Sequence, residues 1–90
     1  MDADALKAEA ILGQDAEDFV KSELGRYVLG RVEQEREQAV QAFSKTAPWR
    51  TRRIKELQNE IWRCDTFKGW LVDIVLAGKE AVSLLEQRDG

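Results

Sequence analysis

Apolar residues recur at alternating spacings of three and four along the second half of the chain. This spacing places them on one face of a helix and is typical of a coiled-coil seam. We therefore predict a helix over residues 48–88. Cap-type residues and a glycine leave a break near residues 64–69 open, but we favour a continuous helix. Only a lysine and a glycine interrupt the seam, whose positions are Ile54, Leu57, Ile61, Cys64, Lys68, Leu71, Val75, Gly78, Val82 and Leu85.

A weaker seam precedes it over residues 22–46, where Ser22 is a good helix N-cap. The centre of this stretch, residues 33–38, is entirely polar, so it must be solvated or paired through contacts between residues four apart. Thr46 is suited to cap the following helix, and Pro48 fits its first turn. The seam positions of this helix are Gly25, Leu29, Val32, Arg36, Ala39 and Phe43.

Residues 1–21 predict a short N-terminal helical segment in two pieces. Asp2 or Asp4 can cap the first piece, Gly13 is expected to end it, and Asp15 can cap the second. Strand-type alternation and hairpin-turn dipeptides are absent from the sequence. We therefore expect one all-α domain over residues 1–90, built as an antiparallel helical hairpin with this short segment and completed by oligomerisation.

The expectation of self-association comes from residues 67–85, which are apolar around most of the helix circumference. A helix of this kind is buried on nearly all sides, and a 90-residue chain has little else to cover it. The alternative is that the N-terminal segment completes a monomeric bundle. Gly78 on the seam indicates either a close approach of a second backbone or a tolerated helix glycine. The predicted oligomer interface consists of Phe67, Trp70, Leu71, Ile74, Val75, Gly78, Val82 and Leu85.

Composition narrows the function classes. The chain has no histidine and one cysteine, which argues against a self-contained zinc site, an internal disulfide and a conventional general base. Glu33 and Glu37 have the spacing of a cation-binding pair but lack the histidines of a di-iron bundle. Cys64 on the seam favours a buried, inert thiol over a reactive one. We expect no catalytic, cofactor or metal site and no enzyme activity, and the short apolar runs favour a cytoplasmic protein without a membrane span or signal peptide.

Charge is distributed unevenly, although the net charge is only −3. Residues 1–24 contain seven acids and two lysines, whereas residues 48–64 contain five basic and two acidic residues. The basic stretch holds the one basic-aromatic cluster of the sequence, and three interpretations of it stay open. It can be a salt-bridged or solvated face, with Asp15, Glu17 and Asp18 supplying opposite charge. It can also bind an acidic protein partner or a polyanion. As a nucleic-acid site it would combine phosphate contacts with base stacking, through Trp49, Arg50, Arg52, Arg53 and Lys55.

One further pattern links several of these segments. The stretch Ser22–Arg31, followed by Leu57–Trp62 and then by Trp70, Leu71, Ile74 and Gly78, resembles small helical proteins encoded among phage and prophage structural genes. The resemblance covers about residues 15–85. It implies a multimeric assembly or interaction module, cytoplasmic or virion-associated, that acts on a phage structural or packaging protein.

Overall fold

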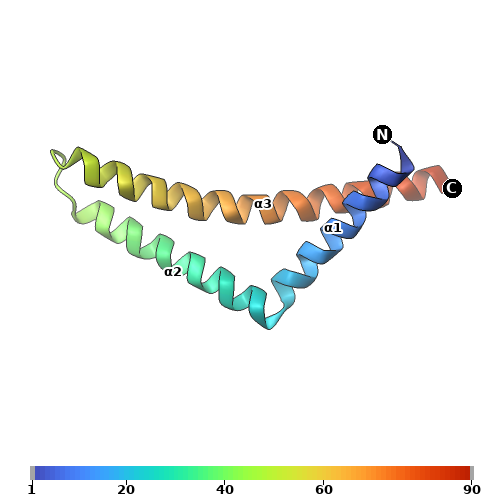
Figure 1. The fold of residues 1–90 in the computed structure, drawn as a ribbon, viewed down its shortest axis with the longest axis horizontal. Helices are drawn as coiled ribbons and strands as arrows, with labels where there is room; N and C mark the ends of the chain where they lie inside the picture. The colour runs from blue at the N-terminus through green and yellow to red at the C-terminus, as the bar shows by residue number, and fades with distance from the viewer. Residues whose placement is uncertain (1, 90) are drawn as a thin grey trace.

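The computed structural model describes residues 2–89, and over this range all regular secondary structure is helical. Three helices follow one another: α1 (Ala3–Lys21), α2 (Glu23–Lys45) and α3 (Thr51–Asp89). The predicted all-α class is therefore confirmed. Figure 1 shows α1 and α2 as the two arms of a V whose ends both meet α3, while the apex between them lies away from α3.

The first helix is continuous, and the prediction that Gly13 ends it is wrong. Asp2 caps α1 by accepting a hydrogen bond from the Ala5 amide at 2.8 Å. Gly13 is buried in the middle of the helix, where it packs against the backbone of α3. Its conformational cost in a helix, about 1 kcal/mol relative to alanine, is offset by that close contact.

A single non-helical residue, Ser22, separates α1 from α2. It ends α1 through its backbone N–H, which donates to the carbonyls of Asp18 and Phe19. It also caps α2, because its Oγ accepts from the Gly25 amide at 2.9 Å, and the same Oγ donates to the Phe19 carbonyl at 2.6 Å. The predicted role of Ser22 as an N-cap is confirmed, and the structure adds that the residue fixes the bend.

The connection between α2 and α3 differs from the prediction. Thr46 ends α2 instead of capping α3: its hydroxyl donates to the Ala42 carbonyl at 2.6 Å. Pro48 is the second residue of a turn closed by a hydrogen bond from the Arg50 amide to the Ala47 carbonyl, a position that suits its fixed φ angle. Consequently α3 begins at Thr51, after Pro48 and Trp49.

The third helix runs without interruption for 39 residues, through residues 64–69. At 1.5 Å per residue it is about 58 Å long, and it sets the 60 Å length of the molecule. The radius of gyration is 18.2 Å, whereas a compact chain of this length has a value of about 12 Å. The buried core is correspondingly small. It consists of Leu6, Ala16, Ala39, Leu57 and Ala81.

Candidate interaction surfaces

The crossing of α1 over α3 is a contact between two glycines. A Cβ atom added to Gly13 would lie 2.6 Å from the Gly78 Cα and 3.1 Å from the Ile74 carbonyl oxygen. A Cβ atom added to Gly78 would lie 2.6 Å from the Gly13 Cα and 3.1 Å from the Glu9 carbonyl oxygen. Of the two interpretations of Gly78, the close approach of a second backbone is therefore correct, and that backbone belongs to the same chain.

The eight residues of the predicted oligomer interface do not form one exposed surface. Gly78 is buried beneath α1, and Phe67, Leu71, Val75 and Leu85 are half-buried. The others remain exposed and comprise Trp70, Ile74 and Val82. The seam of α3 is thus used largely by α1 and α2 of its own chain.

An apolar groove lies between the bend of the V and the middle of α3. Its volume is about 450 Å³. Val20 lines it from α1 and Leu29 from α2, while α3 contributes Leu71, Val72, Val75 and Leu76. Val72 and Leu76 are not seam residues, and they are 55% and 58% exposed. Sequence reasoning missed them as site residues because only the bend beside them creates the groove.

Three charged residues stand at the edge of this groove: Glu17, Lys21 and Lys68. Lys21 pairs with Glu17 across one helical turn at 3.3 Å, and Lys68 pairs with Glu33 of α2 at 2.7 Å. Each charge therefore has an opposite charge from the same chain. The groove offers apolar contact in its interior and no strong net charge at its edge.

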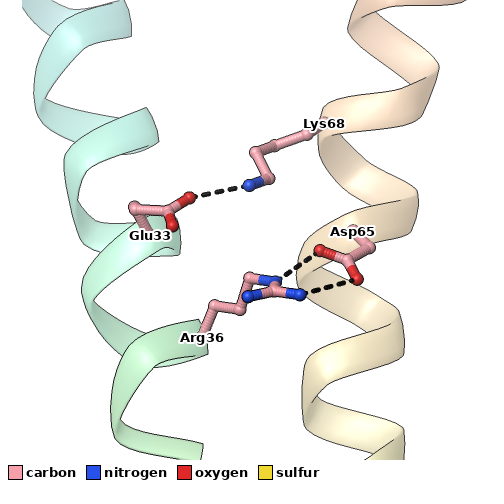
Figure 2. Close-up of polar contacts among 4 residues, drawn as sticks. All are labelled: Glu33, Arg36, Asp65 and Lys68. Atoms are coloured by element: carbon pink, nitrogen blue, oxygen red, sulfur yellow. Dashed lines mark hydrogen bonds and ion pairs between the residues drawn. The ribbon is translucent and has the colours of Figure 1, made fainter. Parts of the chain in front are cut away.

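Two ion pairs join α2 to α3 on the polar centre of α2. Figure 2 shows the Arg36 guanidinium donating to both carboxylate oxygens of Asp65, at 2.7 and 3.5 Å, beside the Lys68–Glu33 pair. The hydrogen bond from Arg36 lowers the pKa of Asp65, and the hydrogen bond from Lys68 lowers the pKa of Glu33. The bond to Asp65 also raises the pKa of Arg36.

These pairs explain the two cations that interrupt the predicted seams. Arg36 interrupts the seam of α2 and Lys68 that of α3, and each finds its carboxylate on the other helix. The sequence contains a signal for these pairs, because on each helix a carboxylate, Glu33 or Asp65, lies three residues before the cation. The sequence-based expectation for this stretch was solvation or pairing between residues four apart; the structure contains an ion pair of that spacing, Arg31–Glu35, beside the two pairs to α3.

The basic-aromatic cluster occupies the tip of the molecule where α2 connects to α3, at the far left of Figure 1. Trp49 is 81% exposed, and the Arg52 side chain is 96% exposed. The suggested neutralisation by acids of residues 15–18 is wrong, since these belong to α1 at the other side of the bend. Glu56, one turn along α3, pairs instead with Arg53 at 3.3 Å and Arg52 at 3.8 Å.

Cys64 lies half-buried between α2 and α3. Burial raises the pKa of its thiol, with the nearby Glu35 carboxylate acting in the same direction. A raised pKa keeps the sulfur protonated and weakly nucleophilic near neutral pH.

Neither a metal cluster nor a membrane span is found in the described part of the chain. No three or more Asp, Glu or Cys side chains gather there in a way that could hold a metal ion. Of the considered Glu33–Glu37 pair, Glu33 accepts from Lys68 and Glu37 accepts from Gln41. Within residues 2–89, no helix is both long enough and apolar enough to cross a membrane.

Comparison of the chain with protein-family models, with curated proteins and with solved structures gives no match.

Proposed function

We propose that this chain is a non-enzymatic, self-associating helical protein that serves as an assembly or interaction module. The observation that carries the proposal is the disproportion between buried and exposed apolar side chains. Among the described residues only two large apolar side chains are buried, Leu6 and Leu57, whereas fourteen large ones are exposed. Such an excess of exposed large apolar side chains over buried ones favours a protein–protein interaction site.

The size of the exposed surface supports a second protein subunit. The chain exposes 6857 Å², whereas a compact monomer of 10.3 kDa exposes about 5,400 Å². The difference is about 1,500 Å², and each partner of a stable dimer buries about 800 Å². The excess is larger than the area that one partner of such a dimer buries, so the chain has enough exposed surface to bury in an interface of this size. In this proposal α2 and α3 form the helical hairpin that the second copy completes.

The cellular setting of the module is a further part of the proposal. The resemblance of residues 15–85 to small phage and prophage proteins supports a role on a phage structural or packaging complex. Neighbouring genes test this setting: we expect portal, capsid or terminase genes beside this one, and a consistently unrelated neighbourhood would contradict it.

Sedimentation velocity tests self-association directly. Over a protomer concentration from about 1 µM to about 300 µM, mass action shifts a self-associating chain towards the oligomer. We expect the weight-average mass to rise with concentration from the 10.3 kDa of one chain towards twice that value or more. A strictly monomeric mass throughout this range would overturn the proposal.

A second candidate function is polyanion binding by the tip cluster. The specific observation in its favour is that Trp49, Arg50 and Arg52 are exposed. They belong to the connection between α2 and α3 and the start of α3, at the opposite end of the molecule from α1 (Figure 1). The first turn of α3 contains no acidic residue, so its positive helix-terminal potential adds to that of the cations.

Titration against single-stranded DNA and RNA at low and high salt tests this candidate. We expect affinity to fall with salt, because phosphate contacts release counterions, and to fall further in the Arg52→Glu plus Arg53→Glu variant. The matched control is Lys7→Glu plus Arg26→Glu, which makes the same charge change on α1 and α2. Absence of binding at low salt, or an equal loss in both variants, would exclude the tip as the site.

A further inference from the structure

The bend between α1 and α2 holds the apolar groove open. On one side of it, the Gly13–Gly78 contact attaches α1 to α3. On the other side, the Arg36–Asp65 and Glu33–Lys68 pairs attach α2 to α3. Between these attachments the chain bends at Ser22, which caps the end of α1 and the start of α2. The two helices therefore cannot close down on the middle of α3 without breaking one attachment or straightening the bend.

The chemistry of the groove selects an apolar occupant. Its interior is formed by valine and leucine side chains of all three helices, and its three charged edge residues are paired within the chain. A charged peptide would gain no unpaired opposite charge there. An aliphatic surface would instead remove apolar area from water, at about 25 cal/mol per Å².

The chain itself carries a surface of this kind beside the groove. Val72 and Leu76 lie one helical turn apart on α3, line the groove and remain more than half exposed. In a two-fold dimer the same surface of each subunit forms the interface, so this surface must both receive side chains of the partner and insert its own side chains into the partner. Val72 and Leu76 meet this requirement, since they can enter the groove of a neighbour while their own groove receives the same residues.

From these observations we infer that the groove is the docking site for a second copy of this chain. Val72 and Leu76 of each copy pack against Val20 and Leu29 of the other, around a two-fold axis near the middle of α3. This inference rests on the proposed self-association and specifies its site. It differs from the interface expected from the seam, because Gly78 is already occupied by α1 and Trp70 lies outside the groove lining.

The inference is tested by comparing exposed residues inside and outside the groove. Because Val72 and Leu76 are exposed in the single chain, Val72→Lys plus Leu76→Lys should leave its helical circular dichroism unchanged. Replacing central contacts of an interface raises the dissociation constant by about 30-fold or more, and we expect this for the groove variant in sedimentation velocity. Trp70→Lys and Ile11→Lys change exposed residues that do not line the groove and should leave the dissociation constant within about threefold.

The outcomes separate this inference from the proposed function. A wild-type oligomer that survives Val72→Lys plus Leu76→Lys overturns the groove as the docking site, while self-association stands. If Trp70→Lys alone dissociates the oligomer, the interface lies on the opposite side of α3, and the groove is likewise overturned as the docking site. A wild-type chain that remains monomeric overturns both.

Discussion

At the scale of single residues, the glycines of this chain have different roles that only the packing reveals. Gly13 and Gly78 allow two backbones to touch where α1 crosses α3, so that each occupies the space of the other's absent side chain. Gly69 and Gly30 face open space, with nothing within 4 Å of an added Cβ. The same residue type is therefore required at the crossing and dispensable at positions 30 and 69.

Alanine substitutions on α3 test this distinction within one helix. Gly78→Ala places a Cβ against backbone atoms of α1 that cannot rotate away, so we expect a loss of about 2 kcal/mol in the free energy of unfolding, typical of overpacking. Gly69→Ala, the matched control, should instead stabilise by about 0.5–1 kcal/mol, because alanine is the better helix former. Urea denaturation measures both, and equal effects at the two sites would contradict the glycine crossing.

The carboxylates of the interhelical ion pairs predict a pH dependence. The pKa values of Glu33 and Asp65 are lowered by Lys68 and Arg36, so the unfolded chain takes up protons at a higher pH than the folded chain. Their contribution to stability is complete above about pH 4.5 and is lost as the pH falls through the lowered values. Urea denaturation between about pH 6 and pH 3 should show a smaller pH slope for Glu33→Gln plus Asp65→Asn, and equal slopes would contradict these pairings.

At the scale of helices, the bend at Ser22 decides the architecture. Without it, residues 3–45 would form one helix antiparallel to α3, and the groove would close. Three local features hold the bend: the double capping by Ser22, the hydrogen bond of its hydroxyl to the Phe19 carbonyl, and the absence of a side chain at Gly25. A Cβ added to Gly25 would coincide with the Phe19 carbonyl group.

Gly25→Ala is therefore expected to alter the bend, because the new methyl group and the Phe19 carbonyl cannot share one place. We expect a loss of about 1–3 kcal/mol in the free energy of unfolding and a changed distance between spin labels on α1 and α2. Gly30→Ala adds the same methyl group to α2 in open space and should stabilise by about 1 kcal/mol without moving the labels. An unchanged label distance in Gly25→Ala would show that the bend does not depend on this glycine.

The elements also show what the sequence could and could not predict. Periodicity and capping residues were sufficient for the helical class and for Ser22 as a helix start, because these signals are local. The prediction for Gly13 was wrong because a glycine that ends a helix cannot be told from a glycine that packs against a second helix by the local sequence alone. The difference depends on Gly78, which is distant in the chain and contacts Gly13 only in the folded structure. Arg36 and Lys68 could be predicted to pair between helices only if both helices were considered together, since each cation binds a carboxylate on the other helix. Thr46 can cap either neighbouring helix, and packing decided for α2.

At the scale of the whole molecule, length and thinness determine stability. The extents of 60 × 28 × 15 Å describe a flat body whose shortest dimension is a quarter of its length. A body of this shape cannot surround its own apolar residues, which explains why, in the described part of the chain, three of the five buried apolar residues are alanines. In the proposed dimer, part of the exposed apolar surface is buried between copies, so that association adds to the stability of the folded chain.

That coupling makes the melting temperature depend on protein concentration. When unfolding separates two copies, each tenfold rise in concentration adds about 1.4 kcal/mol to the apparent free energy of unfolding, by mass action. Because two copies of 90 residues each unfold together, this corresponds to an increase of about 3–6 °C in melting temperature. Circular dichroism melts at concentrations tenfold apart measure the shift. The Val72→Lys plus Leu76→Lys variant should lose the shift, whereas Ile11→Lys should retain it, and a wild-type melting temperature independent of concentration would show that one copy folds alone.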